Sequence, residues 1–156
     1  MAFAAKYLFL LVLLLALVFI VTRGWPGAKS VLFFAVFSLP LTFGLARLAG
    51  HLYFDPRPFV SGHFMPLISH ARDNGFPSDH ALLCFSLASL VFVFDRKWGL
   101  LLGAIAVLVS AARVYAGVHS PIDIVGSFLI SVVAVSIVYL ARNLVRQRRI
   151  LHAGSG

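Results

Sequence analysis

The sequence predicts an all-α membrane protein, and its composition, its hydropathy and the spacing of its apolar runs all point there. Of its 156 residues, 61% are hydrophobic and 12% charged, and mean hydropathy is +0.99. Soluble domains carry about 25% charged residues. The formal net charge of +8 raises the possibility of nucleic-acid binding. However, the basic residues lie at the ends of apolar runs rather than in one stripe, so no nucleic-acid partner is expected.

Five apolar segments follow one another, each bounded by charge, proline or glycine. A helix needs about 20 residues to cross the hydrocarbon core, and the third and fourth segments reach that length only with the adjoining Pro77–His80 and Arg113–Tyr115. We therefore expect about five transmembrane helices and an interfacial outer loop, forming a single domain over residues 1–156. The segments are Ala5–Thr22, Ser30–Gly50, Ala81–Phe94, Trp98–Ala112 and Pro121–Ala141.

Lysine and arginine residues set the expected orientation. They cluster in two turns and in the tail, which share one side if five helices alternate, and positive charge marks the cytoplasmic side. The N-terminus, the Leu52–Gly75 loop and the segment around His119 would then face outward, with the C-terminus inside. The basic residues are Arg23, Lys29, Arg96, Lys97, Arg142, Arg146, Arg148 and Arg149.

The stretch Arg113–Asp123 joins the last two segments and holds an arginine, a histidine and an aspartate. Ser120, Pro121 and Asp123 are typical of a helix start: an N-cap serine, proline at the first position and a carboxylate at the third. Asp123 can turn back to orient the imidazole of His119, leaving the other ring nitrogen free as a nucleophile. Alternatively, Asp123 only completes a capping box with Ser120.

Two further polar clusters lie at helix ends on the same side. In Asp55–Phe59, two prolines stiffen the chain around Arg57. In Phe76–His80, Ser78 is an N-cap candidate, the free amides behind it suit an anion, and His80 lies in the first turn. Taken singly, Arg57 and Arg113 could serve lipid headgroups or a helix dipole, and His80 could be incidental.

The three clusters together indicate a phosphate site. Arginine forks and helix-end amides bind phosphate and stabilise charge on its equatorial oxygens. Two histidines beside them would supply a nucleophile and an acid, so this combination favours phosphoryl transfer.

The clusters resemble the three signature motifs of the type 2 phosphatidic acid phosphatase superfamily. Phe76–His80, with Asp79 where most members have glycine, is similar to the bacitracin-resistance branch of undecaprenyl-pyrophosphate phosphatases. The resemblance implies a metal-independent hydrolase without cofactors in a bacterial cell membrane, acting on a lipid pyrophosphate or phosphate. His119 would form a phosphohistidine. The other implied roles are orientation of His119 by Asp123, leaving-group protonation by His80, and phosphate binding by Arg57, Ser78 and Arg113.

This chain departs from the family pattern in two ways. The first motif usually has a lysine seven residues before its arginine, and that position is Gly50. Arg47 and His51 are candidates to replace the lysine. Many members also have six transmembrane helices, whereas five are expected here.

Other interpretations of the same residues stay open. Ser78, His119 and Asp123 could form a hydrolase triad, although no nucleophile-elbow motif surrounds the serine. His80, His119 and Asp123 could instead bind a metal, although two arginines would repel it. A transporter would need polar residues in mid-membrane, and serines such as Ser127 and Ser131 equally suit helix packing. A broader phosphatidate or phosphatidylglycerophosphate phosphatase would share the same site.

The outer loop offers two less specific features. His63 and His70 are expected to be solvated. Its apolar residues predict either an interfacial flap for a lipid tail or an aromatic anchor at the membrane surface. They are Phe54, Phe59, Phe64, Met65, Leu67 and Ile68.

Overall fold

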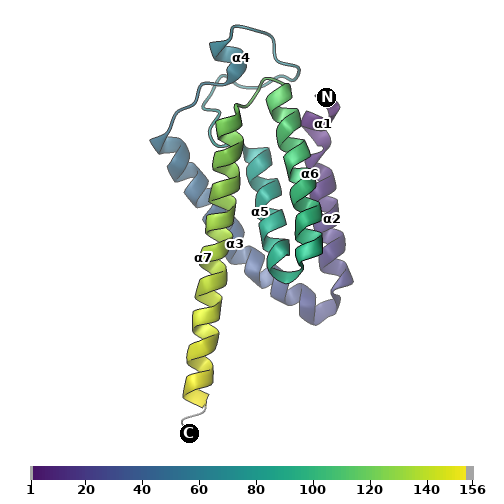
Figure 1. Cartoon of the computed structure of the whole chain (residues 1–156), viewed down its shortest axis with the longest axis vertical. Helices are drawn as coiled ribbons and strands as arrows, with labels where there is room; N and C mark the ends of the chain where they lie inside the picture. The colour runs from purple at the N-terminus through teal and green to yellow at the C-terminus, as the bar shows by residue number, and fades with distance from the viewer. Residues whose placement is uncertain (1, 154–156) are drawn as a thin grey trace.

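The protein is a bundle in which the longer helices run lengthwise, from one end of the molecule towards the other (Figure 1). The computed structural model describes residues 2–153, and side chains as far as Arg148. The helices are α1 (Ala2–Tyr7), α2 (Phe9–Thr22), α3 (Gly24–Leu52), α4 (Pro58–Ser61), α5 (Asp79–Phe94), α6 (Arg96–Tyr115) and α7 (Pro121–Ala153).

All five predicted apolar segments are helical, and the predicted helix-bundle class is confirmed. The first segment is divided at Leu8 into α1 and α2, and the last helix continues beyond the predicted end at Ala141 to Ala153. Three helices, α3, α6 and α7, are long and apolar enough to cross a membrane, while α2 and α5 are shorter apolar helices. The described residues therefore form a multi-pass helical membrane protein.

Helix α5 lies at the centre and contacts α2, α3, α6 and α7. Small residues let the helices approach closely, as is usual where lipid replaces water and apolar burial alone gives no drive for association. A Cβ atom on Gly99 of α6 would lie only 2.4 Å from the Cα of Phe92 in α5. The buried core of the bundle includes Phe19, Phe34, Ala81, Ala88, Leu90, Leu102 and Ala106.

Buried serines join α5 to α7 directly beneath the polar end of the bundle. The hydroxyls of Ser86 and Ser131 are 3.1 Å apart. The hydroxyl of Ser127 lies 2.7 Å from the carbonyl oxygen of Asp123 and 3.0 Å from that of Ser78. The first turns of α5 and α7 are thus held side by side, which fixes the relative position of two predicted site segments.

The two ends of the bundle differ in character. At one end lie the N-terminus, α4 with its long loop, and the starts of α5 and α7, whereas the C-terminus lies at the other (Figure 1). At that opposite end, Arg23 and Asp95 form an ion pair at 3.1 Å, which brings together the two basic turns expected on one side of the membrane.

Candidate active site

His119 lies in the connection between α6 and α7 and is only 2% exposed. The turn before it needs Gly117, whose φ is +76°, a backbone conformation that glycine adopts without a steric penalty. Nδ1 of His119 lies 3.1 Å from Oδ2 of Asp123 and 3.1 Å from the carbonyl oxygen of Gly75. Both partners accept hydrogen bonds, so Nδ1 carries the ring proton.

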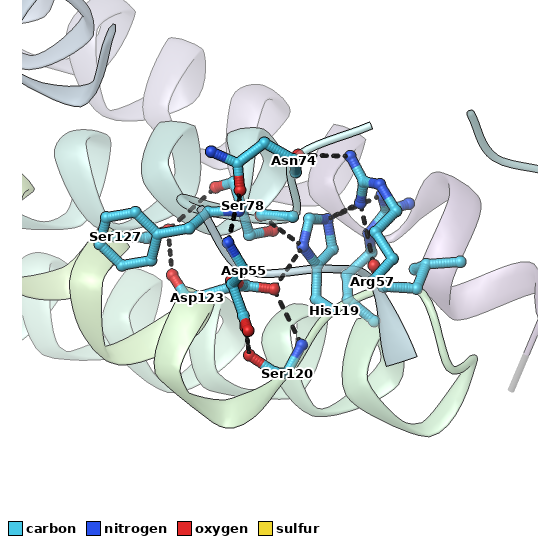
Figure 2. A network of polar contacts seen from close by, with 12 residues as sticks. Asp55, Arg57, Asn74, Ser78, His119, Ser120, Asp123 and Ser127 are labelled. Carbon is cyan, nitrogen blue, oxygen red and sulfur yellow. Dashed lines mark hydrogen bonds and ion pairs between the residues drawn. The ribbon is translucent and has the colours of Figure 1, made fainter. Parts of the chain in front are cut away.

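The other ring nitrogen of His119 faces two guanidinium groups. Nη1 of Arg57 and Nη2 of Arg113 each lie 3.3 Å from Nε2. Because guanidinium nitrogens only donate, Nε2 is unprotonated and presents its lone pair between two positive charges. Figure 2 shows Arg57 and His119 in this arrangement. An unprotonated ring nitrogen is thereby placed beside two groups that can bind a phosphate anion.

Asp123 performs both of the alternative roles considered from the sequence. Its Oδ2 accepts from Nδ1–H of His119 and from the backbone N–H of Ser120 at 2.8 Å. It therefore completes half of a capping box and orients the imidazole with one oxygen (Figure 2). The Ser120 hydroxyl does not cap α7 but donates to Asp55. Gly75 is required beside this pair, because a Cβ there would lie 3.0 Å from Oδ2 of Asp123.

Arg57 is fixed by the loop that follows it. Its Nε donates to Asp73 at 2.7 Å, Nη1 to the carbonyl of Val118 at 2.9 Å, and Nη2 to the carbonyl of Asn74 at 3.3 Å. The hydrogen bond from Arg57 holds the pKa of the Asp73 carboxyl below its usual range. The guanidinium is 5% exposed, so its direction is set before any substrate arrives.

Arg113, in the last turn of α6, is held in place by a hydrogen bond to α1. Its Nη1 donates to the carbonyl of Ala5 in α1 at 3.2 Å. Within the described residues, the buried Nε of Arg113 has no hydrogen-bond partner. A donor in that position is available to an anion.

Ser78 is the N-cap residue of α5, as predicted, but its side chain makes no capping bond. The hydroxyl is fully buried and has no hydrogen-bond partner among the described residues. Figure 2 places Ser78 beside the His119–Asp123 pair. A buried hydroxyl at a helix N-terminus, with the first amides of α5 behind it, suits an anionic ligand.

His80 occupies the first turn of α5 and is half-buried. Its ring packs edge-on against Phe9 of α2 with the centroids 4.8 Å apart. It lines a cavity of about 640 Å³ together with Arg113. Since Arg113 also contacts His119, the two histidines lie near one guanidinium at the same end of the bundle.

Sequence reasoning missed the contribution of Asn74, in the long loop. Asn74 accepts from the backbone N–H groups of Asp55 and Phe76 and donates to the carbonyls of Gly50 and Tyr53, all within 2.9–3.0 Å. The Asn74-Gly75 pair is a turn signal, and it could have marked this position.

The prediction that His70 is solvated is wrong, whereas His63 is exposed as expected. The His70 ring is half-buried and packs edge-on against His119, with centroids 5.9 Å apart. The loop is fastened over the site because the amides of Phe59 and Leu67 donate to the carbonyls of Gly117 and Ala116, both at 3.1 Å. These contacts carry His70 inward. Burial and the nearby charges of Arg57 and Arg113 lower its pKa.

The loop's apolar residues divide between buried and exposed positions, and the lipid flap and the membrane anchor both remain predictions. Phe59 is buried with Ala5, Ala112, Ala116 and Val118 in a second small core. By contrast, Met65 is 91% exposed and Leu67 is 53% exposed. The loop is therefore anchored at its centre and presents an apolar outer surface.

A second, more polar cavity of about 370 Å³ lies on the α3 side of the site. Arg47, Gly50 and His51 line it together with Arg57. A Cβ on Gly50 would lie 3.0 Å from the carbonyl oxygen of Phe76, so the loop closes over the position where the family pattern has lysine. Arg47 and His51 remain candidates for its role.

Burial lowers the pKa of His119, and the charges of Arg113 and Arg57 lower it further, against the raising effect of Asp123. The imidazole is therefore neutral at physiological pH, as a nucleophile must be. Among the described side chains, no group of three histidine, cysteine or acidic residues is placed to hold a metal ion.

The fold and the site together define a polytopic helical membrane protein with a preformed histidine–aspartate pair facing two arginines. Residues 31–147 match the model of the PAP2 superfamily, and the chain belongs to that superfamily. The resemblance read from the three motifs is confirmed.

Relatives of this chain are 33–35% identical to it over the aligned residues. The bacitracin transport permease protein BcrC of Bacillus licheniformis is 33% identical over 138 residues, covering 88% of this chain and 68% of that protein. The putative undecaprenyl-diphosphatase YbjG of Escherichia coli is 35% identical over 128 residues, covering 81% and 64%. The undecaprenyl-diphosphatase BcrC of Bacillus subtilis is 35% identical over 82 residues, covering 53% and 42%. No solved structure matches the chain.

Proposed function

We propose that this chain is an integral-membrane hydrolase that converts undecaprenyl diphosphate to undecaprenyl phosphate through a phosphohistidine intermediate. The observation that carries the proposal is the position of Nε2 of His119, 3.3 Å from a nitrogen of each of two buried arginines. Two relatives, one named an undecaprenyl-diphosphatase and the other a putative undecaprenyl-diphosphatase, support the choice of substrate.

In the first step, Nε2 of His119 attacks the terminal phosphorus and forms a P–N bond. The bond from that phosphorus to the bridging oxygen breaks, and the oxygen leaves with the electron pair on the lipid monophosphate. His80 supplies the proton that this oxygen takes up. Arg57, Arg113 and Ser78 bind the equatorial oxygens, where charge develops.

In the second step, water attacks the phosphorus and the P–N bond breaks. The electron pair returns to Nε2, and His80, now neutral, accepts a proton from the water. Inorganic phosphate is released and both histidines regain their starting protonation states. Asp123 keeps the proton of His119 on Nδ1 throughout, so Nε2 is the reactive nitrogen in each turnover.

The membrane orientation is part of the proposal. The site lies at the end of the bundle opposite the C-terminal basic residues, and positive charge favours the cytoplasm. The site then faces outward in a bacterial plasma membrane, where it would recycle the carrier lipid of cell-wall assembly. Labelling of single cysteines at Met65 and Arg146 with a membrane-impermeant reagent, in a Cys84→Ser background, tests this. Labelling at Arg146 but not at Met65 in intact cells would indicate the opposite orientation.

The test of function is phosphate release by the purified chain in detergent, with undecaprenyl diphosphate and phosphatidylglycerophosphate compared at equal concentrations. We expect higher kcat/KM on the first substrate and an acid-labile phosphoenzyme that His119→Ala lacks. Higher kcat/KM on phosphatidylglycerophosphate would change the assigned substrate and would leave the proposed mechanism unchanged. Absence of phosphate release from both substrates would refute the proposed hydrolase activity.

A bacitracin transporter is the second candidate function, because the Bacillus licheniformis relative is named a bacitracin transport permease. The same protein in liposomes distinguishes the two functions. Uptake of labelled bacitracin without any phosphate release would support a transporter. Phosphate release without uptake would support the hydrolase.

A further inference from the structure

A second feature of the active-site end is the cavity of about 640 Å³ between α1 and the outer loop, which we call the α1–loop cavity. It opens beside His80 and Arg113 and is bounded by residues from the first helix and from the end of the loop. Its lining is Ala2, Phe3, Lys6, Tyr7, Leu67, Ile68, Ser69, His70, His80 and Arg113.

The chemistry of this lining differs from that of the smaller cavity on the α3 side. The smaller cavity includes the carboxylates of Asp73 and Asp79 beside its basic groups. Among the described residues that line the α1–loop cavity, none is acidic, and its polar side chains include Lys6, His70 and Arg113. An additional anionic group is therefore favoured in the α1–loop cavity and repelled in part from the other.

The position of His80 indicates that the leaving group departs towards the α1–loop cavity. A general acid must lie within hydrogen-bond reach of the oxygen that it protonates, so the leaving group departs on the His80 side. His80 lines the α1–loop cavity and does not line the smaller one. The leaving group of a lipid diphosphate is a lipid monophosphate, which has both an anionic head and an apolar tail.

We propose that the α1–loop cavity binds this leaving group, with Lys6 contacting the phosphate that stays on the lipid. This rests on the proposed function and deepens it, because it assigns the selection of diphosphate over monophosphate to a residue outside the three motifs. The neighbouring Ala5 carbonyl accepts a hydrogen bond from Arg113 at 3.2 Å. The backbone that carries Lys6 is thus tied to the guanidinium that faces the nucleophile.

The rest of the lining suits the lipid. Phe3, Tyr7 and Leu67 are 76%, 41% and 53% exposed, and they give the α1–loop cavity exposed apolar side chains beside its basic ones. An isoprenoid chain can contact these apolar side chains while its phosphate reaches Lys6. On a lipid monophosphate, an uncharged carbon chain would occupy the place of that phosphate, and Lys6 would have no charged partner.

The test compares two substrates that share one chain, farnesyl diphosphate and farnesyl monophosphate, on the full-length protein in detergent. Lys6→Gln is expected to lower kcat/KM on the diphosphate about 10-fold or more, as loss of a charge-assisted hydrogen bond does. The effect on the monophosphate should be less than about 3-fold if Lys6 has no charged partner there. Lys6→Arg should restore most of the diphosphate activity.

Lys29→Gln is the matched control. Both lysines are exposed and lie over a neighbouring aromatic ring, Lys6 at 5.2 Å from the Tyr7 centroid and Lys29 at 4.8 Å from that of Trp25. Lys29 lies at the far end of the bundle, so its substitution should leave kcat/KM unchanged on both substrates. Equal losses on both substrates in Lys6→Gln, or an equal loss in Lys29→Gln, would overturn the assignment of Lys6.

Product inhibition supplies an independent measurement. Farnesyl monophosphate, as the product of the diphosphate reaction, should inhibit wild type more strongly than Lys6→Gln, whereas inhibition by inorganic phosphate should be unchanged. Unchanged inhibition by both would contradict the inference. If wild type fails to hydrolyse any diphosphate, the proposed function itself fails, which is a different result from hydrolysis that is indifferent to Lys6.

Discussion

The two histidines at the polar end of the bundle are held in very different ways. His119 has a polar partner on every side: Asp123 and the Gly75 carbonyl at Nδ1, Arg57 and Arg113 at Nε2. His80 is held by the packing of its ring on Phe9 and faces a cavity. A nucleophile must be fixed in tautomer and direction, while an acid must follow a departing oxygen. The difference in restraint therefore matches the difference in proposed role.

The largest expected effect comes from removing the nucleophile. His119→Ala should abolish turnover on every phosphate substrate, because no P–N bond can form without Nε2. Phosphate release and phosphoenzyme trapping measure this, and Ser61→Ala, on the exposed side of α4, serves as a folded control. Near-normal hydrolysis by His119→Ala would remove the basis of the comparison.

Removing His80 should have a smaller effect that depends on the leaving group. On a lipid substrate, His80→Ala is expected to lower kcat about 10²–10⁴-fold, the usual contribution of general acid catalysis. On 4-nitrophenyl phosphate, whose leaving group needs little protonation, the loss should be much smaller. Equal losses on both substrates would mean that His80 does not act as the acid.

The arginines should rank next. Arg57→Gln or Arg113→Gln is expected to lower kcat/KM about 10²–10³-fold, as is typical for a preorganised charge stabiliser. Arg72→Gln, in an exposed part of the same loop, is the control and should be close to wild type. A loss confined to KM would indicate that the guanidinium binds the ground state and transition state equally.

The pH dependence of kcat/KM tests the electrostatic surroundings of His119. Burial and two guanidinium charges lower the pKa of His119, so the neutral, reactive form persists below the ordinary histidine value of about 6.5. As pH falls through that lowered pKa, kcat/KM should fall with it. Arg57→Gln removes one lowering charge, so its acid limb should move to higher pH. An unshifted or lower acid limb would argue against this electrostatic account.

The smallest expected effect is that of a chelator. Because positive charge at the site comes from arginines, EDTA should leave phosphate release unchanged within about 2-fold, whereas metal-dependent phosphoryl transfer loses the charge neutralisation that its ions provide. Activity assays with and without added Mg²⁺ check this. Loss of activity that Mg²⁺ restores would require a different mechanism.

Local signals in the sequence were sufficient for much of the site. Ser120, Pro121 and Asp123 lie within one helical turn, so their geometry follows from helix-start chemistry, and the link from Asp123 to His119 was predicted. The apolar runs likewise predicted the five long helical segments. Their ends were less certain because the length of α7 beyond Ala141 depends on polar residues that also suit a loop.

Tertiary contacts decided what the sequence could not show. Asp73 reaches Arg57 across 16 residues, and His70 is turned inward by hydrogen bonds from Phe59 and Leu67 to the turn after α6. Lys6 shares a cavity with His80 because α1 packs beside α6. None of these pairs has a characteristic spacing, so polar loop residues looked like ordinary solvated ones.

The four hydrogen bonds of Asn74 have a consequence for how a lipid gets in. They tie the loop to Gly50 and Tyr53 at the end of α3 and to Asp55 and Phe76, so lifting the loop away would break all of them together. Entry into the α1–loop cavity from the side, past Phe3 and Tyr7 in its lining, would leave these four bonds in place. If the lipid takes that route, the protein samples its substrate by two-dimensional diffusion, and its turnover should follow the mole fraction of lipid in the leaflet rather than the bulk concentration.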